Sequence, residues 1–211
     1  MLVLVMKNIL IHGLGQNNSS WNKVIDELSK NNIEVDNPNL YLFLKDKSAD
    51  YPTLLNEFID YCNAFDDKLN LCGLSLGGIL ALDYAKKYPD KVNSLILIGV
   101  PATIPKFLFK FQGLIFHIMP KSTFTKIGCT KNDFISLVNS MSILDIKNNL
   151  DKINNKTLIL YGVKDKQNIK SSKILKDNIK NSTFLLIDEA SHEVNVDNTV
   201  KLADIIKDFW R

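Results

Sequence analysis

The sequence is poor in cysteine, and the few cysteines it has are not spaced as cross-links. There are three, Cys62, Cys72 and Cys129, and no pair has C-x-x-C spacing. A secreted disulfide framework or a zinc knuckle needs paired, suitably spaced cysteines. Both are therefore disfavoured, and we expect free thiols in a reducing, cytoplasmic compartment.

A long apolar run and a concentration of positive charge are also missing. No apolar stretch approaches the roughly 18 residues of a membrane-spanning helix, and the mean hydropathy is −0.02. The first six residues are apolar, but without a basic segment before them or a small-residue cleavage site after them no signal peptide is expected. The net charge of +3 is scattered along the chain, which disfavours a nucleic-acid partner.

What remains is the composition of one globular domain in which strand and helix patterns alternate. The 211 residues are 45% hydrophobic and 23% charged, enough to bury a core without staples. Helical spacing of apolar residues recurs behind Ser19-Ser20, behind Pro52 and near the C-terminus. Short apolar runs, predicted to be strands buried between helices, lie at residues 8–12, 32–36, 68–73, 93–99, 157–162 and 183–188.

This alternation predicts an α/β fold of about six mainly parallel strands with helices on both faces. One stretch of over fifty residues interrupts it, with an apolar segment followed by two weaker helical patterns around 134–141 and 143–150. A structureless loop of that length would be unusual in a compact domain. We expect a small helical cap at 101–155, inserted into a core formed by 1–100 and 156–211.

The strongest chemical signal is the G-x-S-x-G pattern of Gly73-Leu74-Ser75-Leu76-Gly77. It follows a predicted strand and runs into a helical pattern. A sharp turn of this kind exposes a serine hydroxyl above the edge of the sheet. The alternative is a plain glycine turn with a surface serine.

Two later strands are followed by the groups that could activate this serine. A serine hydroxyl needs an imidazole to take its proton, and the imidazole needs a carboxylate to fix its tautomer and stabilise its charged form. Asp165 and His192 each come directly after a predicted strand. Asp188 is a rival acid, but it lies only four residues from His192, and a surface histidine is the alternative for His192 itself.

The first predicted strand is followed by His12-Gly13-Leu14-Gly15. A backbone N–H in this turn, with the N–H of Leu76, would form an oxyanion hole. The competing interpretation, a dinucleotide-binding loop, needs G-x-G-x-x-G, and the third glycine is missing. We expect His12 to be structural, and His117 lies in the apolar insertion, which leaves His192 as the base.

Together these motifs resemble the α/β-hydrolase fold family from His12 to the last helix. The resemblance implies a three-layer α/β-hydrolase fold with Ser75 as nucleophile, Asp165 as acid and His192 as base. It places the oxyanion donors on the backbone N–H groups of Leu14 and Leu76. The long insertion falls where the family carries its lid or cap.

The sequence departs from the family at two places. There is no room for the strand pair that often precedes the first run. Many members have Asp-x-x-Gly-x-Gly after the second strand, whereas Asp36-Asn37-Pro38-Asn39 has neither glycine. A serine nucleophile, in place of an aspartate, disfavours dehalogenase and epoxide-hydrolase chemistry.

The expected function is hydrolysis of a small carboxylic ester or thioester through an acyl-enzyme, without metal or organic cofactor. Phe107, Phe111 and Phe116 are predicted to line a pocket for an apolar acyl group, although they would equally serve to pack the cap onto the body. Two other functions stay open, a C–C bond hydrolase or lyase on the same triad and a non-catalytic, ligand-binding member of the fold. A membrane-surface lipase has little support.

Overall fold

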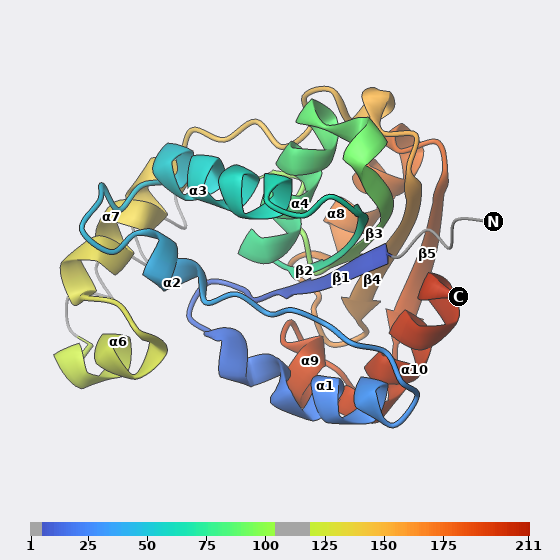
Figure 1. Cartoon of the computed structure of the whole chain (residues 1–211), viewed down its shortest axis with the longest axis horizontal. Coiled ribbons are helices and arrows are strands. Elements are labelled where there is room, and N and C mark those ends of the chain that lie inside the picture. The colour runs from blue at the N-terminus through green and yellow to red at the C-terminus, as the bar shows by residue number, and fades with distance from the viewer. Residues whose placement is uncertain (1–5, 104–118) are drawn as a thin grey trace.

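A sheet of five parallel strands lies at the centre of the protein (Figure 1). The structure is a computed structural model and describes residues 6–103 and 119–211. In this part of the chain the strands lie side by side in the order in which they follow along the sequence. Their bounds are β1 Met6–Ile11, β2 Lys68–Leu74, β3 Val92–Ile98, β4 Lys156–Gly162 and β5 Ser182–Ile187.

Helices cover both faces of the sheet. Their bounds are α1 Asn22–Ser29, α2 Leu40–Phe43, α3 Tyr51–Asn63, α4 Leu76–Lys87, α6 Lys121–Ile127, α7 Lys131–Met141, α8 Ile169–Asn178, α9 Val194–Asp197 and α10 Thr199–Trp210. Helices α3, α4 and α8 lie on one face and α1, α9 and α10 on the other (Figure 1). Helices α2, α6 and α7 lie beyond the carboxyl end of β1.

Two apolar layers hold this arrangement together, because successive side chains of a strand point to opposite faces. Leu71 and Leu97 belong to the layer with α3 and α4, whereas Cys72 and Ile96 belong to the layer with α1 and α10. All four side chains are fully buried, as predicted for strands covered on both sides. Each large apolar side chain buried in this way contributes roughly 1.5–3 kcal/mol, so the sheet is a rigid base for the loops at its edge.

The predicted α/β architecture is confirmed, and the described residues form five strands where about six were expected. Residues 32–36 form only an isolated bridge, between Asp36 and Ile9. The N–H of Ile33 is used by the last turn of α1, to which it donates at 3.2 Å. Pro38, two residues beyond the bridge, has no N–H with which to extend the ladder.

Helices form at all three places where the spacing predicted them, although one start signal was misread. Helix α3 begins after Asp50, whose carboxylate accepts a backbone N–H of the first turn at 2.8 Å. Pro52 lies in that turn, where its missing N–H costs nothing. The expected cap at Ser19-Ser20 is wrong, because both serines lie inside a short 3-10 helix, η1 (Asn18–Trp21), which the side chain of Asn17 caps.

Between β3 and β4 the described residues form α6, α7 and a 3-10 turn, η3 (Leu150–Lys152), while a further turn, η2 (Pro89–Lys91), precedes β3. Helix α7 matches the helical pattern around 134–141, whereas α6 was not expected. The pattern around 143–150 forms no helix, because Ile143 is 82% exposed and Asn149 adopts a φ of 59°. The predicted acyl-pocket residues lie outside the described residues: Phe107, Phe111 and Phe116.

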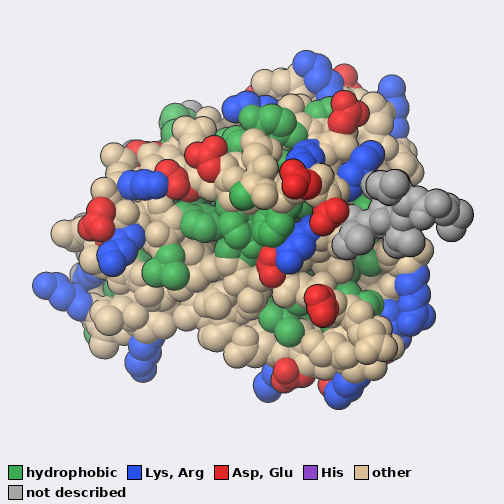
Figure 2. All heavy atoms as spheres, viewed as in Figure 1, with side chains coloured by type: hydrophobic (Ala, Val, Ile, Leu, Met, Phe, Trp, Pro, Cys, Tyr) green, Lys and Arg blue, Asp and Glu red, His purple; other side chains and the backbone are tan. Residues whose placement is uncertain are grey.

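Acidic and basic side chains are interspersed over the surface, as the scattered charge predicts. Figure 2 shows this for one face, with hydrophobic side chains gathered near its middle. Some of these charges pair, among them Lys7 with Asp36 at 2.8 Å and Lys47 with Glu57 at 2.5 Å. Within residues 6–103 and 119–211, no helix has both the length and the apolar character needed to cross a membrane.

Candidate active site

Ser75 lies in a strained turn between β2 and α4. Its φ of 51° and ψ of −109° lie outside the regions that residues with a side chain ordinarily occupy. The turn is tight because strand and helix almost touch, since a Cβ atom on Gly73 would come within 2.3 Å of the backbone of Gly77. A Cβ atom on Gly77 would come equally close to the backbone oxygen of Ile11. Glycine is thus required on both sides of the serine.

The backbone of Ser75 is hydrogen-bonded to the neighbouring strand β3, and the residue after it begins helix α4. The N–H of Ser75 donates to the carbonyl of Ile98, at the end of β3, at 2.8 Å. Leu76 is the first residue of α4, and the first N–H groups of a helix have no acceptor within it. The N–H of Leu76 is therefore available to a negative atom beside the serine.

His12 is a structural residue, as the sequence predicts. Its side chain is fully buried, its Nε2 accepts the N–H of Leu40 at 3.0 Å, and its Nδ1 lies 2.9 Å from the carbonyl of Gly13. The first contact requires an acceptor and the second a donor, so the ring is neutral with the proton on Nδ1. Burial lowers the pKa of His12 to about 4, against an ordinary 6.5.

The turn after His12 passes beside the serine turn and presents the N–H of Leu14. A Cβ atom on Gly13 would lie 3.4 Å from the backbone oxygen of Leu74. Gln16 closes the turn by donating its N–H to the carbonyl of Gly13 at 3.3 Å. The N–H of Gly15 donates to the buried Tyr41 hydroxyl at 3.1 Å, whereas the N–H of Leu14 has no backbone or side-chain acceptor among the described residues.

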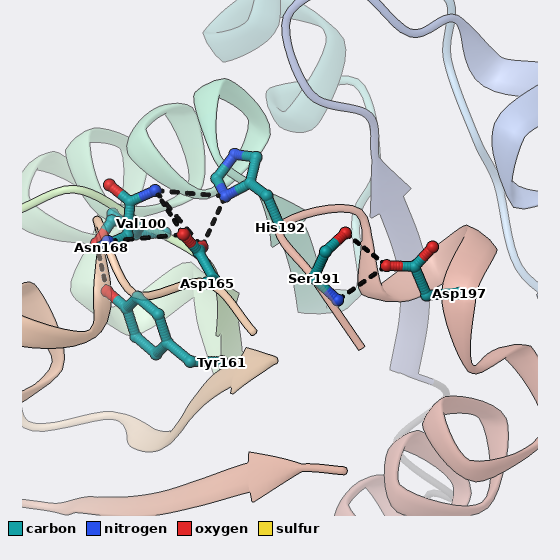
Figure 3. A network of polar contacts seen from close by, with 7 residues as sticks. All are labelled: Val100, Tyr161, Asp165, Asn168, Ser191, His192 and Asp197. Carbon is teal, nitrogen blue, oxygen red and sulfur yellow. Dashed lines mark hydrogen bonds and ion pairs between the residues drawn. The ribbon is translucent and has the colours of Figure 1, made fainter. Parts of the chain in front are cut away.

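Asp165 and His192 form a close pair at the carboxyl ends of β4 and β5 (Figure 3). Asp165 Oδ2 lies 2.7 Å from His192 Nδ1. The Asp165 side chain is 5% exposed and that of His192 is 38% exposed. The imidazole therefore has a buried carboxylate on one side and solvent on the other. The amide of Asn168 donates to both oxygens of Asp165, at 3.0 and 3.3 Å.

This environment keeps Asp165 ionised. Burial by itself raises the pKa of a carboxyl group. The hydrogen bond and charge of His192, together with the hydrogen bonds from Asn168, outweigh that effect and leave the pKa of Asp165 below its usual range. A charged Asp165 can hold the Nδ1 proton of His192 and leave Nε2 free to accept another.

Gly99 links the pair to Ser75, and sequence reasoning missed it. It directly follows Ile98, the residue that accepts the N–H of Ser75. Its φ is +59°, and a Cβ atom there would lie 3.0 Å from Cε1 and Nδ1 of His192. The imidazole thus packs against the backbone next to the serine turn. The available signal is that Gly99 ends the apolar run at 93–99, which by itself indicates only the end of a strand.

The segment that carries His192 is held by hydrogen bonds between Asp197 and Ser191, the residue before the histidine (Figure 3). Asp197 Oδ2 accepts the N–H of Ser191 at 2.7 Å and also its hydroxyl. These hydrogen bonds lower the pKa of Asp197. Across the site, the Tyr161 hydroxyl donates to the carbonyl of Val100, which holds the chain that leaves β3.

The predicted residues thus lie at the carboxyl ends of the parallel strands, but the expected contact between the serine and the histidine is not formed. The described residues include no hydrogen bond between Ser75 and His192. The rival acid, Asp188, has an exposed side chain, and it is Asp165 that pairs with the imidazole.

The sequence profile of the alpha/beta hydrolase fold matches residues 9–122, which is more than half of the chain and includes the Ser75 turn. The chain belongs to the alpha/beta hydrolase fold family. Mouse monoacylglycerol lipase ABHD6 is 23% identical over 254 residues, covering 95% of this hydrolase-fold chain and 74% of the mouse protein.

Two further comparisons agree with this family. The Caenorhabditis elegans abhydrolase domain-containing protein abhd-5.2 is 37% identical over 97 residues, which cover 42% of this chain and only 22% of the nematode protein. The structure of a thermophilic esterase from Thermogutta terrifontis superposes with a TM-score of 0.78 at 19% identity, covering 98% of this chain and 90% of the esterase. At that identity the superposition shows the fold alone.

Within the part of the chain that the structure describes, no group of three or more His, Cys, Asp or Glu side chains could hold a metal ion. A cavity of about 930 Å³ lies between the segment after α2 and the helices α6 and α7. Tyr41, which contacts the Leu14 turn, is in its wall, but Ser75, Asp165 and His192 are not.

Proposed function

We propose that this chain is a serine hydrolase of carboxylic esters or thioesters with Ser75, His192 and Asp165 as its triad. The observation that carries the proposal is the Asp165–His192 hydrogen bond, which is made at the sheet edge where Ser75 occupies a strained turn. A plain glycine turn would not need this backbone conformation, and a plain surface histidine would not need a buried carboxylate behind it.

The first half of the reaction forms an acyl-enzyme. Ser75 Oγ attacks the carbonyl carbon while His192 Nε2 accepts the hydroxyl proton. The positive imidazole is stabilised by Asp165 through Nδ1. The N–H groups of Leu14 and Leu76 donate to the oxyanion of the tetrahedral intermediate, and each such donor contributes about 100- to 1000-fold in rate. His192 then protonates the departing alcohol or thiol as the intermediate collapses.

The second half reverses these roles with water. His192 accepts a proton from a water molecule, which attacks the acyl carbon, and returns that proton to Ser75 as the acid leaves. His12 takes no part, because both of its ring nitrogens are engaged and its pKa is too low for it to act as a base near neutral pH.

The relatives support an ester substrate. A monoacylglycerol lipase aligns with 95% of this chain at 23% identity. We propose an apolar acyl group, which Phe107, Phe111 and Phe116 in the 101–155 cap would contact. A flat rate across acyl chain lengths would count against that part of the proposal.

Replacing Ser75 tests the nucleophile. In Ser75→Ala the nucleophilic oxygen is lost, so hydrolysis of p-nitrophenyl esters should fall by about 10⁴-fold or more and fluorophosphonate labelling should disappear. Ser29→Ala removes an exposed hydroxyl at the end of α1 and should leave both unchanged. Undiminished labelling of Ser75→Ala would overturn the assignment.

The acyl-enzyme itself is tested by pre-steady-state kinetics. A burst of alcohol or thiol equal to the enzyme concentration would support it. Cleavage of a C–C bond without such a burst would favour the same triad in a hydrolase or lyase of that kind. Saturable ligand binding without turnover across ester and thioester panels would favour a non-catalytic member of the fold.

A further inference from the structure

A buried pair of amide side chains joins the loop of the proposed oxyanion donor to the loop of the proposed base. Gln16 Nε2 donates to Asn195 Oδ1 at 3.2 Å, and Asn195 Nδ2 donates to Gln16 Oε1 at 3.1 Å. The two residues are 179 positions apart in the sequence. Gln16 is 7% exposed and Asn195 is 1% exposed, so neither amide can exchange its partner for bulk water without opening the structure.

Each partner is also fixed within its own loop. Gln16 lies two residues after Leu14, and its backbone N–H closes the turn that presents the Leu14 N–H. Asn195 lies three residues after His192 in α9, and its backbone carbonyl accepts the hydroxyl of Thr199 at 3.2 Å. The side-chain pair therefore connects two backbone segments that are each locally rigid.

A third contact ties the pair to η1. Asn195 Nδ2 also donates to the backbone carbonyl of Ser20 at 3.3 Å, and the Ser20 hydroxyl lies 3.1 Å from Gln16 Oε1. Each of the four polar atoms of the two amides has a partner, and Gln16 Oε1 and Asn195 Nδ2 have two each. Because amide side chains do not titrate, the strength of this contact does not depend on pH.

The sheet explains why such a connection is needed. The Leu14 turn follows β1 and the His192 loop follows β5, and these strands are the two opposite edges of the sheet. With strands about 4.8 Å apart, the edges are separated by roughly 19 Å. Strands β1 and β5 do not pair with each other, so the loops that follow them meet through contacts outside the β-ladder, such as this amide pair and the packing of α1 against α10.

We infer that Gln16 and Asn195 are positioning residues that set the place of the Leu14 N–H relative to His192. The inference rests on the proposed function, in which both groups act on one tetrahedral intermediate. A misplacement of about 1 Å between catalytic groups costs about 100-fold in rate. Neither amide side chain forms a hydrogen bond with Ser75, Asp165 or His192 among the described residues, so we expect its effect on the rate of the chemical step more than on substrate affinity.

Exchanging the two amides tests this inference. Gln16→Asn shortens the pair by one methylene and Asn195→Gln lengthens it, whereas the double variant Gln16→Asn/Asn195→Gln restores the summed length and both hydrogen bonds. We expect each single variant to lose about 10- to 100-fold in kcat with KM for a p-nitrophenyl ester changed less than about twofold. The double variant should recover most of that loss.

Asn70→Ala is the matched control. Asn70 is 2% exposed and forms an equally buried amide network in β2, donating to Asn8 at 2.9 Å and accepting from Ser94 at 2.6 Å and Asn93 at 2.8 Å. Its loss should lower Tm while kcat stays within about twofold of wild type. Equal kcat values for the single variants and wild type would overturn the inference. It would also be overturned if Asn70→Ala lost as much kcat as the single variants at a similar decrease in Tm.

Amide hydrogen exchange gives a readout that does not depend on turnover. Asn195→Ala should increase exchange at residues 13–16, on the other side of the pair, as well as at 191–196. Unchanged protection at 13–16 would overturn the inference even in an inactive protein. Failure of the proposed function is separate, because it would appear as absent hydrolysis and absent Ser75 labelling in the wild type.

Discussion

At the scale of single residues, the site depends on groups that are held in one protonation state. Asp165 is kept charged by His192 and Asn168 in spite of its burial, and His12 is kept neutral by burial and by donors and acceptors on both ring nitrogens. In the proposed mechanism His192 accepts a proton, whereas burial and two hydrogen bonds prevent His12 from doing so. The difference lies in what surrounds each imidazole.

Asp165→Asn should separate the charge of this residue from its size. An asparagine amide beside Nδ1 would favour the wrong imidazole tautomer, so kcat should fall by about 10⁴-fold with the fold unchanged. Ester hydrolysis and circular dichroism measure the two effects. Asn168→Ala, which removes donors to Asp165 but leaves the carboxylate, should cost far less. Similar losses in the two variants would contradict this role of the charge.

Ser75, Asp165 and His192 were predictable because each has a local signal, a short motif or a polar residue directly after an apolar run. Gly99 and Asn168 were not, because their roles depend on which loop lies against them. The Gln16–Asn195 pair was the least predictable, because nothing in the sequence near either residue indicates a partner 179 positions away. Local pattern identifies the candidate reacting groups, whereas tertiary packing selects the residues that hold them.

At the scale of elements, the serine turn is a contact between the end of β1, the end of β2 and the start of α4. The glycines of the motif let these backbones approach to distances that no side chain permits. Hydrogen-bond partners also explain why the strand predicted at 32–36 does not form, because Asp36 alone pairs with β1 while the N–H of Ile33 donates to Leu28 in α1. Apolar pattern alone does not reveal which hydrogen-bond partners a segment has already lost.

Gly77→Ala should therefore destabilise the whole turn. Its new methyl group would meet the backbone oxygen of Ile11 at 2.3 Å, and relief requires α4 to move, at a cost of about 1–3 kcal/mol or more. Urea unfolding measures the change. Gly13→Ala, whose methyl group would find only ordinary contacts at 3.4 Å, should change the free energy of unfolding by clearly less. Equal effects would mean that the close approach is relaxed in solution.

At the scale of the whole molecule, stability should fall in acid because one buried imidazole must acquire a charge. The pKa of His12 is about 4 in the folded protein and 6.5 when unperturbed. A group whose pKa is depressed by folding contributes stability that is complete above its unfolded pKa and is lost as the pH falls through its folded pKa. For His12 the loss amounts to about 3 kcal/mol, spread between about pH 6.5 and 4.

His12→Gln should flatten this part of the curve, because glutamine stays neutral at every pH in the range. The measurement is the free energy of unfolding by urea at pH 7, 5.5 and 4. Wild type should lose about 3 kcal/mol more than the variant between the first and last of these. Parallel curves would show that His12 is not responsible for acid sensitivity.

The order of the strands has a consequence for when the site comes into existence. Each strand pairs with the one before it in the sequence, so a growing chain can add to the same edge of the sheet as it leaves the ribosome. The proposed nucleophile, the proposed oxyanion loop and Gln16 all precede residue 80, but His192 and Asn195 come only after β5. A nascent chain that ends before His192 therefore carries the proposed nucleophile without the proposed base.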